Sequence, residues 1–172
     1  SGTLEFYTGT AWGSIATFPQ PPSSLVATNL GTSRAFNNGS ASVAFTASSA
    51  DGGSTITSYT ITSDPGGYTA SGASSPLTIT GLQSNTSYTF TGKATNSIGI
   101  GASSSPSSAI TATTVPQAPT IGTVSITNST TVSVPFTANA SGGSSITSYT
   151  VTASPTVSDI STAAGTSSPL TV

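Results

Sequence analysis

Hydrophobic and polar residues alternate through most of the chain, and no stripe with the period of a helix appears. Apolar side chains occupy every second position in several short runs, as in 77–80 and 88–94. In another run, Val43, Phe45 and Ala47 share the face that we expect to be buried. Clusters of Gly, Pro, Asn and Ser separate these runs and favour turns. The pattern predicts an all-β chain of short antiparallel strands.

The chain contains an internal repeat. Residues 52–65 read GGSTITSYTITSDP and residues 142–155 read GGSSITSYTVTASP, which is an offset of 90 positions. Shorter matches on either side keep nearly the same offset, VAFTA with VPFTA upstream and SSPLTI with SSPLTV downstream. Because the offset changes only where loops are predicted, we interpret the chain as two copies of one module.

This organisation predicts three segments. Residues 1–18 form a β-hairpin that ends a preceding segment, residues 19–115 form domain 1, and residues 116–172 form domain 2, with prolines at the start of each domain. The second copy ends at Val172, which corresponds to Ile79 of the first, so it is incomplete and lacks the last strands. Two explanations stay open: the missing strands lie in further sequence, or a neighbouring chain donates them.

Composition first raises the question of whether the chain folds. The 172 residues include 35 Ser and 34 Thr, and only 3% are charged. Such a composition fits either a disordered, O-glycosylated stalk or a sandwich whose outward positions carry hydroxyl groups. Disorder usually pairs low hydrophobicity with high net charge, whereas this chain is 34% apolar with a net charge of -2. The folded interpretation is therefore favoured.

Composition also excludes most chemistry. The chain has no His and no Cys, so it offers no imidazole base, no thiolate and no metal site built from these ligands. Its 2 basic side chains cannot neutralise a nucleic-acid backbone, and no apolar run is long enough for membrane insertion. The 4 acids, Glu5, Asp51, Asp64 and Asp159, form no calcium-binding cluster, and two of them stand in turn contexts. We predict no enzyme activity and no cofactor.

Two stretches of the first copy carry a resemblance to a known family. DGGSTITSYTIT and LTITGLQSNTSYTFTGKATNSIGIG resemble the turn into the third strand and the last strands of a fibronectin type III domain, over 22–114. The resemblance implies tandem immunoglobulin-like β-sandwiches of seven strands. It also implies a structural tyrosine corner at Leu82 and Tyr88, whose phenol bonds back to backbone. Phe45 and Phe136 stand where the family has a core Trp.

The N-terminal stretch LEFYTGTAWGSI predicts two short strands, Leu4–Tyr7 and Ala11–Ile15, joined by a Thr-Gly turn. It resembles the endings of tail-fibre and other virion proteins of tailed bacteriophages, in which such units assemble between identical chains. A hairpin of this size must pack on something else. We expect Phe6, Tyr7 and Trp12 to form a chain-to-chain interface, with local packing and glycan stacking as alternatives.

Two other features lie outside the strand pattern. Tyr68, in a Gly-Gly-Tyr loop, either packs within the loop or makes a surface contact. Ser103–Ser108 is expected to be a solvated connection between the last two strands.

The resemblances imply a non-catalytic structural spacer and adhesion module of a bacteriophage virion protein, located at the virion surface. The implied partners are other virion or filament subunits in a homo-oligomer, with weak contact to host-surface glycans. Two alternatives stay open: a bacterial extracellular adhesin or filament subunit, and accessory domains of a secreted polysaccharide-degrading enzyme.

Overall fold

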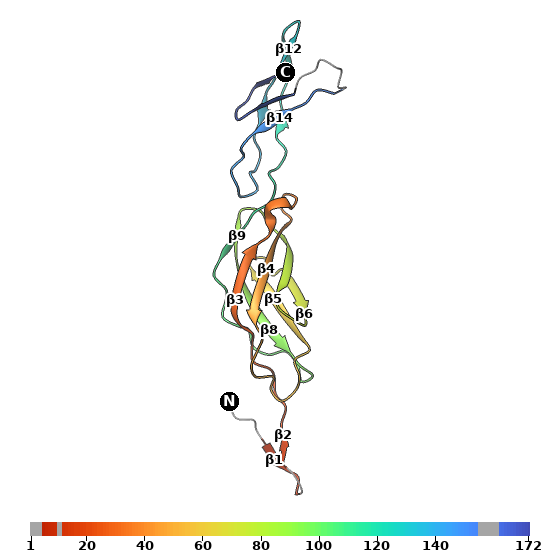
Figure 1. Cartoon of the computed structure of the whole chain (residues 1–172), viewed down its shortest axis with the longest axis vertical. Coiled ribbons are helices and arrows are strands. Elements are labelled where there is room, and N and C mark those ends of the chain that lie inside the picture. Colours follow the sequence, from red (N-terminus) through yellow and green to blue (C-terminus); the bar gives the residue numbers. More distant parts are fainter. Residues whose placement is uncertain (1–4, 10–11, 155–161) are drawn as a thin grey trace.

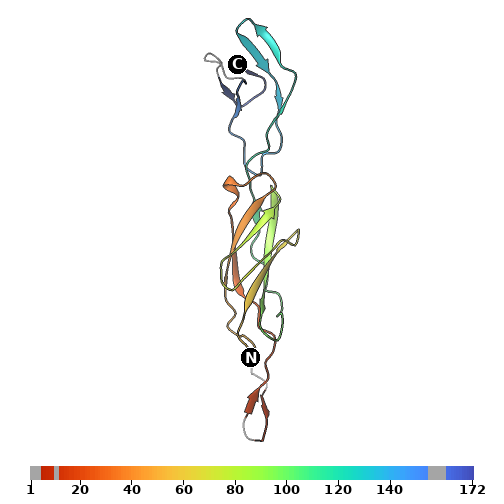
Figure 2. The same cartoon turned by 90° about the vertical axis from the view of Figure 1, so that its right-hand side faces the viewer.

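The structure is a computed structural model that describes residues 5–9, 12–154 and 162–172; the side chains of Phe6 and of residues 12–14 lie outside this description. The described part is built from strands and one short 3-10 helix, which confirms the predicted all-β class. Three groups of strands follow one another along a long axis (Figures 1 and 2). We call the middle group, 19–115, module 1 and the last group, 116–172, module 2.

The first group is the N-terminal hairpin of β1 (Glu5–Tyr7) and β2 (Trp12–Ser14). The two strands are antiparallel, with Tyr7 opposite Trp12. The strand β2 ends at Ser14, one residue before the predicted Ile15, and the predicted Leu4 and Ala11 lie outside the described residues. Figure 1 places this hairpin at the end of the molecule, beyond the loops of module 1.

Module 1 is a sandwich of two antiparallel sheets. One sheet has the order β3-β4-β7 and the other has the order β6-β5-β8-β9. The strands are β3 (Ser23–Asn29), β4 (Gly39–Thr46), β5 (Ser58–Asp64), β6 (Thr69–Gly72), β7 (Leu77–Leu82), β8 (Thr86–Thr95) and β9 (Ile110–Ala112). A 3-10 turn, η1 (Gly31–Ser33), connects β3 to β4.

The core of module 1 lies between the two sheets, where alternate side chains of each strand meet. Val43 of β4, Ile61 of β5, Ile79 of β7 and Phe90 of β8 are each fully buried. Alternation thus identified the buried face correctly in the strands, because side chains on a pleated strand point to opposite faces in turn. Ala47 is an exception: it lies beyond the end of β4 and is exposed, because the strand ends at Thr46.

The serine-rich segment Ser103–Ser108 is a largely exposed connection, as predicted, but Ser104 and Ser107 depart from this by pairing with β8. Ser104 donates its N–H to the carbonyl of Gly92 at 2.8 Å, and its hydroxyl accepts the N–H of Gly92 at 2.9 Å. Ser107 repeats this arrangement on Phe90 at 2.9 and 3.1 Å and is only 7% exposed. Among the described residues, no strand pairs with β8 at Phe90 and Gly92 on the side away from β5. The two serine hydroxyl groups therefore accept the backbone N–H groups that the carbonyls of a neighbouring strand would otherwise accept.

Module 2 repeats the first part of module 1. Its strands are β10 (Thr120–Ile121), β11 (Ser125–Asn128), β12 (Thr131–Val134), β13 (Phe136–Thr137), β14 (Tyr149–Val151), β15 (Ala163–Gly165) and β16 (Leu170–Thr171). They form three small sheets, with orders β10-β13, β11-β12-β16 and β14-β15. Within the described residues, no strand of module 2 corresponds to β8 or β9.

Individual contacts recur in the two modules. The rings of Phe45 and Tyr59 lie 4.9 Å apart in module 1, and those of Phe136 and Tyr149 lie 4.5 Å apart in module 2. The backbone N–H of each phenylalanine donates to a serine hydroxyl at 2.8 Å, Ser75 in module 1 and its counterpart in module 2. These two contacts therefore recur at corresponding positions of the sequence repeat.

Candidate functional site: the linker clamps

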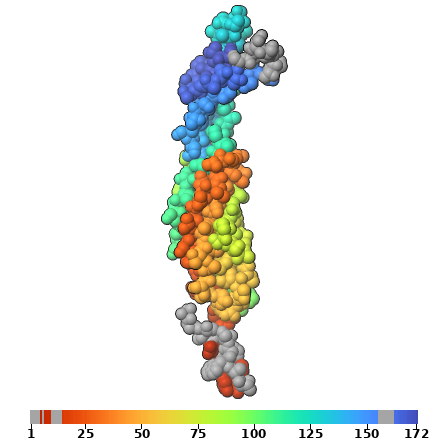
Figure 3. Space-filling view, viewed as in Figure 1, coloured from red at the N-terminus to blue at the C-terminus, as the bar shows by residue number. Residues whose placement is uncertain are grey.

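Each module is entered through a segment with the pattern Thr-x-Pro-Gln, Thr17–Gln20 before module 1 and Thr114–Gln117 before module 2. Proline fixes its own backbone angle and has no N–H to satisfy, so it suits a stiff connection outside a ladder. We call the contacts that hold these segments the first and the second linker clamp. Figure 3 shows the two modules following one another end to end along the long axis.

The first linker clamp is formed by the loop between β4 and β5. The N–H of Thr17 donates to the carbonyl of Gly52 at 2.7 Å, and the N–H of Gln20 donates to that of Ala50 at 3.0 Å. Gly52 has a φ of +73°, and a Cβ at this position would collide with the carbonyl oxygen of Thr17. Only glycine therefore allows both this backbone conformation and this close approach.

Asn96, the residue after β8, completes the first linker clamp. Its side-chain amide donates to the carbonyls of Thr17 at 2.8 Å and Asp51 at 2.7 Å. Its side-chain oxygen accepts the N–H groups of Ile98 at 3.0 Å and Gly99 at 3.1 Å. This residue is 4% exposed, so its four hydrogen bonds use the full capacity of a buried amide.

The second linker clamp repeats the first one. The N–H of Thr114 donates to the carbonyl of Gly142 at 2.8 Å, and the N–H of Gln117 donates to that of Ala140 at 2.9 Å. Gly142 has a φ of +74° and carries no side chain for the same reason as its counterpart, because Thr114 lies directly against it.

Module 1 also holds the second linker from its own side. The side-chain amide of Asn29 donates to the hydroxyl of Thr113 at 2.6 Å, and the N–H of Val115 donates to the carbonyl of Arg34 at 2.9 Å. Gly31 lies so close to the carbonyl of Thr113 that no Cβ fits between them. The linker between the modules is thus hydrogen-bonded to both of them.

The predicted tyrosine corner residues lie in the core of module 1. Leu82 is fully buried and Tyr88 is 2% exposed. The phenol oxygen of Tyr88 accepts the backbone N–H of Gln83 at 2.9 Å. Tyr68 is half-buried and meets the ring of Tyr88 edge-on at a centroid distance of 6.2 Å, so it packs against the core from its loop.

The aromatic residues of the hairpin are only partly described. Tyr7 is 60% exposed and its hydroxyl donates to the carbonyl of Gly9 at 3.0 Å. Phe6 and Trp12 take part in the β1–β2 ladder, but their side chains lie outside the described part. The structure does not bring these residues together with Tyr68, which lies in module 1.

The linker clamps offer hydrogen bonds and close packing rather than reactive groups. Among the described residues, no group of three acidic side chains could hold a metal ion, and no helix has the length and apolarity needed to cross a membrane. Asp159 lies outside the described residues. The arrangement is suited to fixing the direction in which one module follows another.

The comparisons with known proteins agree with this architecture. The sequence profile of the fibronectin type III domain matches residues 20–110, which is more than half of the chain. The chain belongs to the fibronectin type III family. Domains of this family are structural or adhesion-type modules and are typically non-catalytic. A search of curated proteins gave no significant match.

The chain is also similar to several solved structures, each with a TM-score below 0.5. A titin fragment is 23% identical at a TM-score of 0.49, covering 59% of this chain and 36% of that one. A chicken CNTN1 fragment is 21% identical to this chain, with a TM-score of 0.45. The match covers 69% of this chain and 42% of the CNTN1 fragment. A single module of human cardiac titin is 26% identical to this chain, with a TM-score of 0.43. The match covers 55% of this chain and 92% of the titin module. The chain therefore spans only about a third of the length of the titin fragment.

Sequence reasoning missed the residues of the linker clamps. Asn96 stands in the stretch LTITGLQSNTSYTFTGKATNSIGIG without a role of its own, and Gly52 and Gly142 only begin the two aligned stretches. One signal was available: Thr-x-Pro-Gln precedes both modules, at Thr17 and Thr114, and a repeated linker indicates a repeated contact.

Proposed function

We propose that this chain is a non-catalytic spacer and adhesion module of a bacteriophage virion protein, displayed on the virion surface. The observation that carries the spacer role is the repetition of the linker clamp at both module entrances. A spacer must keep a distal part at a set distance, and hydrogen-bonded linkers limit bending better than free ones. The phage assignment rests on the resemblance of LEFYTGTAWG to virion-protein endings.

The partners that we propose are other virion subunits, including identical chains. The N-terminal hairpin carries three aromatic residues within eight positions, and a hairpin with three residues in each strand cannot bury them by itself. Many identical modules on one particle also convert weak contacts with host-surface glycans into useful avidity.

The spacer role can be tested at the second linker clamp. Gly142→Ala places a methyl group against Thr114, so we expect the two modules to lose their fixed mutual orientation. Residual dipolar couplings measured on each module report this directly. Gly67→Ala is the matched control, because Gly67 also has a positive φ but has open space around its Cα. A wild-type chain whose modules already tumble independently would contradict the spacer role.

The phage assignment is tested separately on particles. We expect antibodies raised against the purified chain to label tails or capsids of intact phage in electron micrographs. Labelling of uninfected bacterial cell surfaces, with none on particles, would instead favour the adhesin and overturn the phage assignment.

A further inference from the structure

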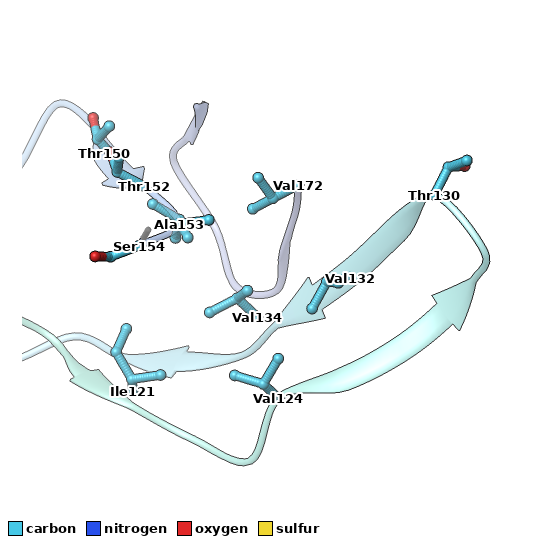
Figure 4. Close-up of a pocket in the computed structure, with 11 residues that line it drawn as sticks. Ile121, Val124, Thr130, Val132, Val134, Thr150, Thr152, Ala153, Ser154 and Val172 are labelled. Atoms are coloured by element: carbon cyan, nitrogen blue, oxygen red, sulfur yellow. The ribbon is translucent and has the colours of Figure 1, made fainter. Parts of the chain in front are cut away.

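Covalent reactivity in this chain is expected at an asparagine of module 1 rather than in the apolar cavity of module 2. That cavity, of about 640 Å³, is lined by apolar and hydroxyl side chains, and none of the lining residues can ionise (Figure 4). In contrast, the loop between η1 and β4 contains Asn38 followed by Gly39, the only Asn-Gly step in the sequence. Because glycine has no Cβ, its backbone nitrogen is the least hindered nucleophile that can follow an asparagine.

An Asn-Gly step can deamidate without an enzyme. The backbone nitrogen of Gly39 attacks the side-chain carbonyl carbon of Asn38 and forms a cyclic succinimide. The side-chain nitrogen leaves as ammonia and takes up the proton of the Gly39 N–H through solvent. Water then opens the ring to aspartate or to isoaspartate, in which the main chain runs through the former side chain. Asn38 is exposed, so water, the only co-reactant, has access to it.

Arg34 holds both carbonyl oxygens of Asn38. Its Nε donates to the main-chain oxygen at 2.9 Å, and its Nη2 donates to Oδ1 at 3.3 Å. These two nitrogens form one edge of the planar guanidinium group, so both oxygens face the same side. The nitrogen of Gly39 is bonded to the same main-chain carbonyl carbon but points away from the bound oxygen. Ring closure therefore requires Oδ1 to leave Arg34 and the side chain to rotate toward Gly39.

The same loop borders the second linker clamp. The backbone carbonyl of Arg34 accepts the N–H of Val115 at 2.9 Å. Asn37 exchanges two hydrogen bonds with Ser84, at 2.8 and 3.2 Å, and the hydroxyl of Ser84 lies 2.6 Å from that of Thr114. An isoaspartate between Arg34 and β4 lengthens the main chain of this loop, so the contacts that the loop makes with the linker change with it.

We propose that Asn38 is a site of spontaneous deamidation, that Arg34 restrains the reaction, and that the isoaspartate product loosens the second linker clamp. The modification converts a fixed junction into a more flexible one as the protein ages. The proposal does not depend on the virion assignment or on the spacer role, because it rests on the contacts of Asn38 alone.

The rate is measured on the intact chain in mildly alkaline buffer, with residue 38 followed by peptide mapping and mass spectrometry. Arg34→Gln removes the paired donors, and we expect deamidation of Asn38 to accelerate about fivefold, the factor that one net hydrogen bond corresponds to. Arg34→Lys keeps the charge but not the fork, so its rate should lie between the two. Asn38→Gln is the unreactive control, because glutamine closes a larger ring much more slowly. Ser84→Ala is the matched control for general loosening, since it removes a contact of Asn37 and leaves both Arg34 contacts in place.

The rates decide the first two parts of the proposal. An absence of conversion at Asn38 in every variant would overturn the site. An unchanged or slower rate in Arg34→Gln and Arg34→Lys would overturn the restraining role. Equal acceleration in Arg34→Gln and Ser84→Ala would overturn it as well, because any loosening of the loop would then have the same effect.

The effect on the second linker clamp is measured separately, by amide exchange at Val115 before and after conversion. We expect faster exchange in the isoaspartate form, because the carbonyl that accepts this N–H belongs to the altered loop. The Asn38→Gln chain, incubated in the same way, should show no change. Unchanged exchange at Val115 in the converted chain would overturn the link between the modification and the clamp.

Discussion

Modules 1 and 2 share a sequence pattern but differ in how deeply the corresponding hydrophobic side chains are buried. Val43 and Ile61 are fully buried in module 1, whereas the corresponding Val134 is 7% exposed and Val151 is half-buried. The contact between a phenylalanine and a tyrosine ring is present in both modules, with a similar centroid distance. The ring contact therefore recurs in both modules, while the counterpart of Ile61 is less deeply buried in module 2.

The largest expected difference concerns the paired phenylalanines. Phe45→Ala should destabilise module 1 by about 3–5 kcal/mol, because a large cavity opens in a closed core. Phe136→Ala should cost module 2 less, although both rings are 8% exposed, because Val151 is only half-buried whereas its counterpart Ile61 is fully buried. Urea titration followed by residue-resolved NMR separates the two modules. Equal losses would contradict an effect of this difference in burial.

A second prediction concerns Asn96, which directly follows β8 in module 1. Asn96→Asp keeps the shape of the side chain but cannot donate to Thr17 and Asp51, so a carboxylate faces two carbonyl oxygens. We expect a loss of about 3 kcal/mol or more in the free energy of unfolding of module 1. Asn128→Asp is the control, because the side-chain oxygen of Asn128 only accepts hydrogen bonds. Similar losses in the two variants would show that the linker contact is unimportant.

The serine contacts along β8 give a third test. Ser107→Ala leaves the N–H of Phe90 without its side-chain acceptor, and we expect a loss of about 2 kcal/mol. The control is Ser105→Ala, since Ser105 is exposed. Amide exchange at Phe90 should accelerate in the first variant and not in the second. Unchanged exchange in both would mean that water replaces the hydroxyl without cost.

The smallest effect is expected at the tyrosine corner. Tyr88→Phe removes the acceptor of the Gln83 N–H while the ring stays in place, so module 1 should lose about 1 kcal/mol. Tyr7→Phe changes an exposed hydroxyl on the hairpin and should leave module 1 unaffected. The two variants are compared by urea unfolding, and identical midpoints would argue against a stabilising corner.

Much of the fold was accessible from local patterns. Alternation identified the buried faces of β4, β5, β7 and β8, because a strand has only two faces and one of them is apolar. It failed where a strand ends, as at Ala47, because the pattern does not mark the residue at which pairing stops. It also did not show that Ser104 and Ser107, within an otherwise exposed connection, hydrogen-bond to β8.

The sequence by itself determined that this chain is all-β, repetitive and almost without ionisable groups, since these properties depend on residue identity and spacing alone. The tertiary structure decided which glycines must remain glycines, where Asn96 directs its amide, and how deeply the repeated side chains are buried in each module. Each of these depends on contacts between segments far apart in the chain, and no local pattern contains that information.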